Sequence, residues 1–408
     1  MLDEGTINRL LERVWPVAEQ LGLNPGHVHF ELVSPQTIQV LASHGGLPVR
    51  YSHWSFGKSE QRLKTAFDFR LTQIYELVIN NIPAYAFIDE TVGEAEALMI
   101  VAHVIAHADF FRHHRGFQHL PVDMLARAAL HRRHMAQFRR QYGDEAVESL
   151  IDAAHILADF SGESLSPSGL GERPDDVLGI VAKTAPGLRD WERDVLSLVW
   201  EEARYFWPQQ VTKVANEGYA TFFHTQILRR VDTSAEESWE TARLNAQIVQ
   251  VHPPQLNPYR LGYLLFQEAF HEGGWDAVAL ARDIYDDAGL VRAYLADELV
   301  ERAGLALFRE REAQPEPRQA NPSEIRVRLL RDLDRAGLPR LVVEEAGPEG
   351  LVLRHLYDGR DLDLAQLPFA LRDVATRVWK GPVTILTMRQ RVPHRMTHNG
   401  VDWVDQVV

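Results

Sequence analysis

The sequence contains no cysteine among its 408 residues. Disulfide frameworks and thiolate-bound metal ions are therefore excluded. A chain without cysteine is compatible with a reducing cytosol but does not prove one.

Long apolar runs are also missing. The longest, Ala95 to Ala108, is interrupted by Glu96, His103 and His107, and it falls short of the ~20 apolar residues that a spanning helix needs. The sequence therefore predicts no membrane span. The amino terminus carries acids early and has no basic segment followed by an apolar run, so we expect no signal peptide.

Positive charge is scarce. Lysine and arginine number 43 against 57 aspartate and glutamate, which gives a net charge of −14. Binding to phosphate backbones needs a basic surface, so we do not expect a general nucleic-acid binder. Histidine is plentiful by contrast, with 18 in the chain and many of them between residues 100 and 160.

Helical periodicity dominates the first three quarters of the chain and predicts a mostly α fold. A short extended segment at 28–34 follows the first helix, and the Ser-, Gly- and Pro-rich stretch 161–187 predicts a surface connection with one short helix. The expected helices cover residues 3–22, 59–80, 93–111, 121–142, 144–160, 189–203, 209–227, 234–248, 262–267 and 291–305.

The pattern changes after a polar, proline-containing segment. We expect a large helical amino-terminal domain over 1–310, a linker over 311–322, and a small α+β domain over 323–408. In that last domain the pattern predicts helices over 323–336 and 365–379 and strands over 341–345, 351–359 and 382–389. An Asn-Gly pair at 399–400 predicts a hairpin turn.

Two histidines in the apolar segment carry the clearest chemical pattern. His103 and His107 are four residues apart, so on a helix both imidazoles face the same side and can reach one ion. Val104 stands where H-E-x-x-H enzymes carry a general base. Asp109 could orient a ligating histidine by a hydrogen bond to its other ring nitrogen. The alternative is a pair of histidines satisfied inside a helical core.

Acidic residues elsewhere could complete a metal site. Glu76 lies in what we expect to be an apolar helix, where a charge is costly unless it is paired. Glu202 follows Glu201 in an aromatic helix, and one of the two is expected to face solvent. Glu217 precedes His224 by two helical turns. The alternatives are a core hydrogen-bond acceptor at Glu76 and an exposed acid beside a helix-packing glycine at Glu217.

Other candidates are accessory. Asn216 adjoins Glu217, and His155 lies on an apolar helix face, where a lone histidine is more often a satisfied core residue. His53, Trp54 and Lys58 lie in a segment that mixes aromatics with hydrogen-bond donors, as binding loops do. A structural aromatic anchor is the alternative for this segment.

Several long segments of the chain form a distinctive set. They are HWSFGK (53–58), YELVINN (75–81), AHVIAHADFF (102–111), the stretch 200–224, NPYRLGYLLF (257–266), and LPRLVVEEAG, LVLRHLYDGRDLDL and GPVTILT near the carboxyl end. In this order they resemble the SpoVR (stage V sporulation protein R) family.

The resemblance implies a cytoplasmic protein of a sporulation or stress programme, connected with formation of the spore cortex. It also implies a serine-protein kinase and a co-encoded protein as partners. The chain departs from the family pattern after Gly57-Lys58 and at Arg112-His113-His114.

These observations lead to a first hypothesis, a metal-dependent hydrolase. His103, His107 and Glu217 would bind a divalent metal, zinc by ligand type. Glu76 or Glu202 would act as the general base. The family's cortex role suggests a cell-wall peptide or related amide as substrate.

Two other hypotheses use the same residues differently. The first is a non-enzymatic regulatory or scaffold partner of a kinase, in which the histidines and acids only stabilise the helices. The second is a ferritin-like site for two iron or manganese ions. Its ligands would be Glu76, His103, His107 and Glu202.

Overall fold

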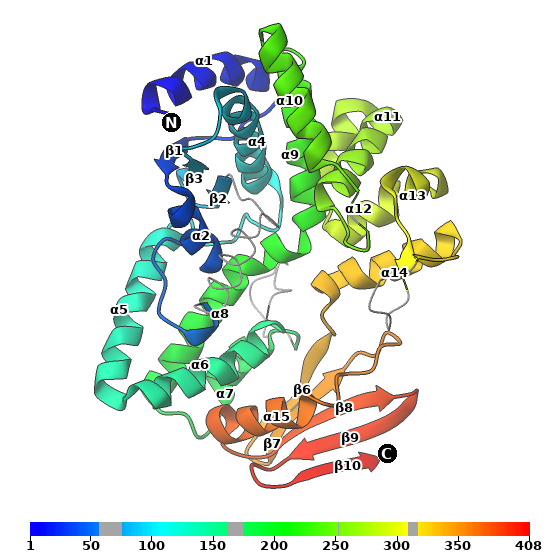
Figure 1. The fold of residues 1–408 in the computed structure, drawn as a ribbon. Coiled ribbons are helices and arrows are strands. Elements are labelled where there is room, and N and C mark those ends of the chain that lie inside the picture. The colour runs from blue at the N-terminus through cyan, green and yellow to red at the C-terminus, as the bar shows by residue number, and fades with distance from the viewer. Residues whose placement is uncertain (57–75, 162–173, 252, 309–316) are drawn as a thin grey trace. The chain divides into compact units, whose positions relative to one another are not determined.

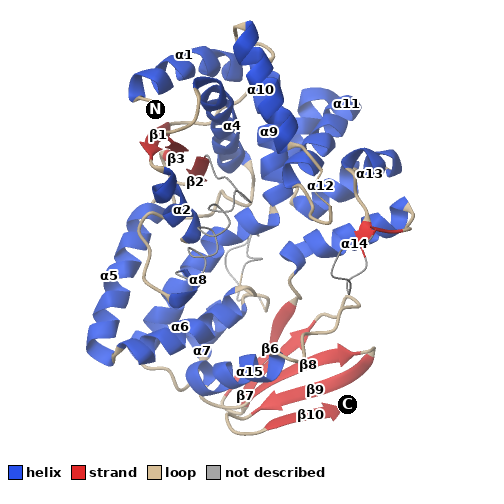
Figure 2. Cartoon of the chain, in the orientation of Figure 1, coloured by secondary structure: helices blue, strands red, loops and turns tan. Residues whose placement is uncertain are grey.

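Helices make up most of the chain, and the strands form small sheets (Figures 1 and 2). The computed structural model describes residues 1–408 except 57–75, 162–173, 252 and 309–316. The predicted mostly α fold is confirmed. The described chain divides into two compact units, each built from two stretches. Unit 1 comprises residues 1–125 and 211–334, and unit 2 comprises residues 126–210 and 335–408. The predicted division near residue 310 is not confirmed.

Unit 1 contains the apolar segment and most of the helices. Its strands β1 (Val28–Val33), β3 (Ala84–Asp89) and β2 (Glu76–Ile79) form one sheet in that order, with β1 parallel and β2 antiparallel to β3. Its described helices are α1 (Glu4–Gln20), α2 (Pro35–Ser43), α4 (Glu94–His113), α9 (Lys213–Leu228), α10 (Ala235–Ile248), α11 (Pro258–Ile284), α12 (Asp287–Tyr294), α13 (Asp297–Ala303) and α14 (Pro322–Leu333), with a two-residue pairing of β4 (Leu307–Phe308) and β5 (Pro317–Arg318).

One prediction in this region is wrong. Residues 76–79 form strand β2, not the end of a helix over 59–80. Leu77, Val78 and Ile79 are branched side chains that fit a pleated surface well. They pair with β3, so Glu76 lies opposite Ile88 in a sheet. The rest of the predicted helix lies mostly outside the described residues.

Helix α4 is the centre of unit 1. Its first turn carries Glu94 and Glu96, which suit the positive end of the helix dipole, and its last turn carries Arg112 and His113. Every residue from 97 to 111 is buried, including the two histidines. A helix that is buried on all sides must satisfy its polar side chains internally, which makes His103 and His107 informative.

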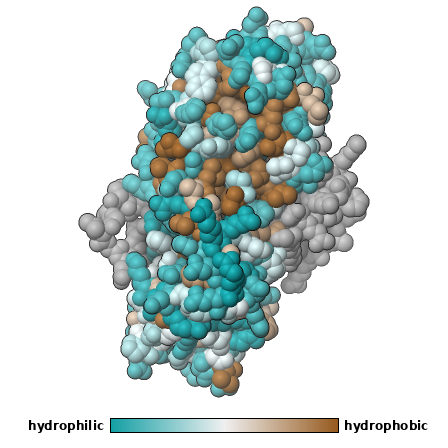
Figure 3. Space-filling model, turned by 90° about the vertical axis from the view of Figure 1, so that its left-hand side faces the viewer, coloured by the Kyte–Doolittle hydropathy of each residue, from teal (hydrophilic) through white to brown (hydrophobic). Residues whose placement is uncertain are grey.

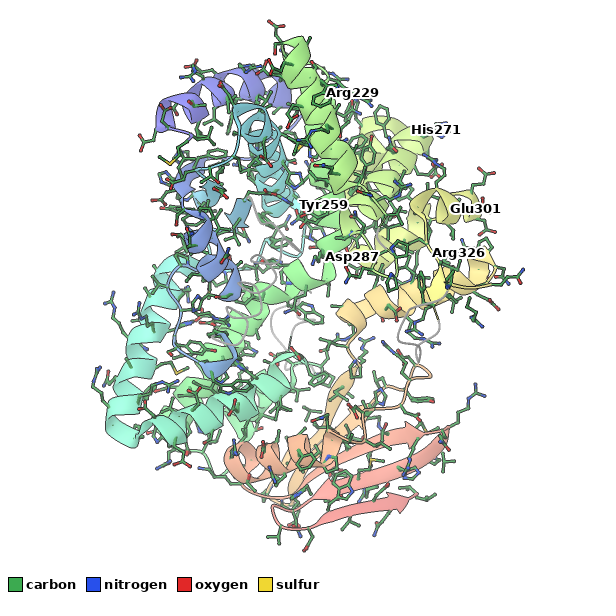
Figure 4. The ribbon with its side chains drawn as sticks, viewed as in Figure 1. Arg229, Tyr259, His271, Asp287, Glu301 and Arg326 are labelled. Carbon is green, nitrogen blue, oxygen red and sulfur yellow. The ribbon has the colours of Figure 1, made fainter. Side chains whose placement is uncertain are left out.

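Helix α9 packs between α4 and α11. Its amino-terminal end is capped from outside, because the Asp287 carboxylate accepts a hydrogen bond from the Ala215 backbone N–H at 2.8 Å. Figure 4 shows Asp287 beside the beginning of α9. Gly218 of α9 meets Gly262 of α11, where a side chain on either residue would overlap the other backbone. The helices therefore approach closely at the turn that carries Glu217.

Unit 2 combines helices with a five-stranded sheet of order β10-β9-β8-β7-β6, in which only β7 and β8 run parallel. The three predicted strands are present, and Asn399-Gly400 turns the chain between β9 and β10, as predicted. The elements are α5 (Met124–Tyr142), α6 (Asp144–Ala158), α7 (Val177–Thr184), α8 (Asp190–Val211), η1 (Asp334–Gly337), β6 (Leu341–Gly347), β7 (Gly350–His355), α15 (Leu367–Asp373), η2 (Val374–Trp379), β8 (Val383–Arg389), β9 (Val392–His398) and β10 (Trp403–Val407).

The surface of unit 1 has an apolar region. Figure 3 shows apolar residues gathered on one face, at the height of the β1–β3 sheet. Within the described ranges, no helix combines the length and apolar character that crossing a bilayer requires.

Candidate metal site

Three side chains from two helices converge in unit 1. Helix α4 supplies His103 and His107, and α9 supplies Glu217. Glu217 Oε2 lies 3.6 Å from His103 Nε2 and 3.5 Å from His107 Nε2. The three potential ligand atoms all lie within 4.8 Å of one another. The structure thus brings together the two turn-spaced histidines and one of the acids proposed with them.

The two carboxylate–imidazole separations are close to those around a tetrahedral cation. Ligands at ~2.0–2.1 Å from a tetrahedral zinc ion are about 3.3–3.4 Å apart. Adjacent ligands of an octahedral ion at similar bond lengths are closer, at about 2.8–3.1 Å. The two measured carboxylate–imidazole distances exceed the octahedral range and lie close to the tetrahedral one.

Two of these atoms are otherwise unsatisfied. His103 Nε2 and Glu217 Oε2 are buried and have no hydrogen-bond partner among the described residues. Buried polar atoms are rarely left without a partner, because each unpaired one costs about 1–3 kcal/mol. A cation between them would satisfy both atoms at once.

Hydrogen bonds on the opposite ring edges fix which nitrogen is free. His107 Nδ1 lies 2.8 Å from Asn216 Oδ1. The amide oxygen only accepts, so Nδ1 carries a proton, and in the neutral ring the lone pair is on Nε2, toward Glu217. Asn216, named above as an accessory residue, thus contacts His107 on the ring edge away from Glu217. Metal-bound histidines commonly donate their other N–H in this way.

His103 is held through a longer chain of contacts. His103 Nδ1 lies 3.0 Å from His224 Nδ1, and His224 Nε2 lies 2.9 Å from Asn245 Oδ1 on α10. His224 is completely buried. Burial, together with the charge of His103, lowers its pKa to about 3, so this ring is neutral at neutral pH.

The electrostatics favour a charged carboxylate facing the two imidazoles. Burial works against ionisation of Glu217, yet the neighbouring His103 and His107 hold its pKa well below the usual range. Burial and the charge of His107 lower the pKa of His103. Burial also disfavours charge on His107, but the Glu217 carboxylate outweighs it and raises that pKa. A charged carboxylate that faces two imidazoles is a donor set that could hold a cation.

Glu76 and Tyr259 belong to the same electrostatic environment. Burial, followed by the negative charge of Glu217, raises the pKa of Glu76 to about 7. Glu217, together with burial, raises the pKa of Tyr259 well above its ordinary value, so its hydroxyl stays protonated. The Tyr259 ring lies over His103 at a centroid distance of 6.0 Å. Figure 4 shows Tyr259 at the start of α11, where α4 and α9 pass.

Asp109 has a different environment from the one expected. Its buried carboxylate accepts hydrogen bonds from the Asn24 backbone N–H at 2.6 Å, the Tyr219 hydroxyl at 2.6 Å and Arg282 at 2.9 Å. His113 Nδ1 lies 3.3 Å away. These partners tie α4 to α9, α11 and the segment after α1, which is a packing role.

Glu202 lies in unit 2, in a separate cluster. Its Oε1 is 3.2 Å from Nδ1 of the buried His131, whose Nε2 lies 2.9 Å from Glu201 Oε2. Arg127 adds a further contact to Glu201. Both glutamates therefore bind one imidazole, and the expectation that one of them only faces solvent is not met. His155, on α6, is half-buried in the same unit.

The aromatic segment near residue 53 is only partly described. His53 is buried, with Nδ1 2.7 Å from Ser55 Oγ, and its ring lies against Trp54 and Phe56. Trp54 itself is more than half exposed. Lys58 lies outside the described residues. The ligand-binding role predicted for this segment stays a prediction.

Sequence patterns did not indicate Asn245 or Tyr259. Asn245 lies in a polar helix with no distinctive spacing. Tyr259 lies in NPYRLGYLLF, one of the segments that carry the family resemblance, but its local pattern indicates only a helix start, with the Asn257 cap followed by a proline. Only the packing of α10 and α11 against α4 and α9 brings these side chains to the histidines.

Comparison with known proteins gives a family. A model described as "SpoVR like protein" matches residues 3–169 and 161–337. The "Uncharacterized protein YcgB" of Escherichia coli (strain K12) is 26% identical over 302 residues, which cover 58% of each chain. The present chain thus spans less than two thirds of that relative. No solved structure matches. Since the family model covers most of the sequence, the chain belongs to the SpoVR family.

Proposed function

We propose that this protein binds one divalent metal ion through His103 Nε2, His107 Nε2 and Glu217 Oε2 and acts as a metal-dependent hydrolase. The observation that carries the proposal is the convergence of these three atoms at 3.5–3.6 Å around Glu217, with two of them buried and unsatisfied. Such a set is expensive in a folded protein unless a cation compensates it.

The donor set fits zinc. Two imidazole nitrogens and one carboxylate oxygen form a three-ligand site of the kind that catalytic zinc uses, with a fourth position left for water or substrate. When bound, zinc supplies Lewis-acid polarisation and makes water a nucleophile at neutral pH. The Nδ1 contacts of both histidines would hold the rings in the ligating orientation.

Glu76 is our choice for the general base. Its carboxyl responds to the charges of Glu217 and His107, and its pKa of about 7 suits a group that gains and loses a proton at neutral pH. In amide hydrolysis, Glu76 would take one proton from water as the C–O bond forms. It would return that proton to the departing nitrogen as the C–N bond breaks. Glu202 is less suited, because its carboxylate contacts His131 in unit 2.

The substrate class follows from the family and not from the geometry. The SpoVR name refers to sporulation, and the resemblance implies formation of the spore cortex, so we propose an amide bond of a cell-wall-related peptide. The kinase and the co-encoded partner suggested by the resemblance remain part of this proposal, as does a cytoplasmic location.

Hydrolysis can be tested on the zinc-loaded protein with a panel of cell-wall peptides and small amides, by mass spectrometry of the products. The wild-type protein should convert an amide substrate into an amine and a carboxylic acid. Glu76→Gln should keep zinc and lose about 100-fold or more of the rate. Glu31→Gln, an exposed change on strand β1 of the same sheet, serves as the control. Equal rates for Glu76→Gln and wild type would contradict the proposed base.

The two alternative hypotheses have less support. A dimetal site would need Glu202 as a ligand, but that carboxylate is bonded to His131 in unit 2. A scaffold without metal would leave His103 Nε2 and Glu217 Oε2 buried without a partner. Binding of two iron or manganese ions per chain would favour the dimetal site over our proposal.

A further inference from the structure

We propose that Asn245 is a positioning residue that selects the ligating tautomer of His103 through His224. This inference rests on the proposed metal site and deepens it. The three side chains come from α10, α9 and α4, and they form one line of contacts: Asn245 Oδ1 to His224 Nε2 at 2.9 Å, then His224 Nδ1 to His103 Nδ1 at 3.0 Å.

Asn245, at one end of this line of hydrogen bonds, determines which nitrogen of each ring carries a proton. The Asn245 amide oxygen only accepts, so His224 Nε2 carries the hydrogen. A neutral imidazole has one N–H, so His224 Nδ1 has a lone pair and accepts from His103 Nδ1. His103 then has no hydrogen on Nε2, the atom that lies 3.6 Å from Glu217 Oε2. One amide oxygen thus determines the protonation of a nitrogen two rings away.

Burial of the two histidines makes them depend on these hydrogen bonds. His224 is fully buried and His103 nearly so, so water cannot easily replace a lost partner. The neutral state of His224 agrees with its lowered pKa. If donor and acceptor were exchanged in these hydrogen bonds, His103 Nε2 would carry a proton toward Glu217 and could not bind a metal ion.

The two histidine ligands are therefore supported in different ways. Asn216 fixes His107 directly from α9, the helix that also carries Glu217. Asn245 fixes His103 indirectly and comes from α10, whose outer face is exposed. Helix α10 thus contributes Asn245 to the proposed site, which its polar sequence does not indicate.

The experiment compares Asn245→Leu with Asn245→Asp. Leucine removes the acceptor at similar volume, whereas aspartate restores an acceptor oxygen. Gln247→Leu, an exposed change on the same helix, is the control for altered helix stability. Two quantities are measured: the imidazole ¹⁵N chemical shifts of His103 and His224 in the metal-free protein, and the zinc dissociation constant by competition with a chromophoric chelator.

Wild type, Asn245→Asp and Gln247→Leu should show His103 protonated on Nδ1 and should bind zinc within about threefold of one another. Asn245→Leu should lose the single tautomer and bind zinc about 10-fold or more weakly, the usual cost of losing a group that orients a metal ligand. An unchanged tautomer and unchanged affinity in Asn245→Leu would overturn the inference. The ¹⁵N shifts decide it even if wild type binds no zinc, an outcome that would defeat the proposed function alone.

Discussion

Gly218 of α9 and Gly262 of α11 pack backbone against backbone: a Cβ built on Gly218 would lie 2.3 Å from the Gly262 Cα. A Cβ on Gly262 would lie 2.1 Å from the Val214 carbonyl oxygen. No larger residue fits here without separating the helices. Because Glu217 precedes Gly218 and Tyr259 is one turn before Gly262, this contact sets the distance between two sides of the proposed metal site.

Gly262→Ala should therefore destabilise the protein by about 1–3 kcal/mol, the usual cost of forcing extra atoms into a packed interior. It should also weaken zinc binding, since α9 carries Glu217. Urea unfolding and zinc titration measure the two effects. Gly347→Ala is the matched control, because a methyl group at Gly347 meets nothing within 4 Å. Equal unfolding free energies for the two variants would show that the helices can move apart without cost.

Asp109 holds four elements of unit 1 together and pairs with Arg282. Asp109→Asn should lower the free energy of unfolding by about 3–5 kcal/mol, because it removes one partner of a buried ion pair and leaves Arg282 without its buried counter-charge. The neighbouring Asp283 also contacts Arg282 but is considerably exposed. Asp283→Asn should therefore cost no more than about 1 kcal/mol. A smaller loss for Asp109→Asn than for Asp283→Asn would contradict this account.

The contacts of His131 with Glu201 and Glu202 predict that the stability of unit 2 depends on pH. Despite burial, Glu201 and Glu202 raise the pKa of His131 to about 9 from 6.5. A raised histidine pKa contributes stability that is fully present below pH 6.5 and is lost as the pH rises through 9. The loss should be roughly 2–3 kcal/mol. Urea unfolding at pH 6.5 and 9.5 measures it.

His131→Gln should remove most of this pH dependence, whereas His134→Gln, an exposed change on the same helix, should keep it. If wild type and His131→Gln lost the same stability between the two pH values, the charge on His131 would not be the cause.

The part of the site that was predictable depends on spacing within one helix. His103 and His107 share a face because four residues make about one helical turn, and both are buried as that pattern suggests. Glu217 was singled out because it precedes His224 by two helical turns. Neither pattern contains the distance between α4 and α9, which depends on how these two helices pack.

Other features depended on long-range packing and were not predictable. Glu76 was expected in a helix, but pairing with β3 made a strand of branched residues more favourable. Strand β3 and helix α2 were not anticipated for the same reason, since short apolar runs do not distinguish helix from strand. The two units also each join distant stretches of chain, which no local change in composition reveals.

Metal content tests the central claim most directly. The protein should be purified without a histidine tag and incubated with one equivalent of zinc. Unbound zinc is then removed by exchange into chelator-treated buffer, and the bound zinc is measured by inductively coupled plasma mass spectrometry. We predict about one zinc ion per chain for wild type and for His113→Ala, and almost none for His103→Ala, His107→Ala or Glu217→Ala. Wild type without bound metal, or a His103→Ala variant with its full complement, would contradict the proposed site.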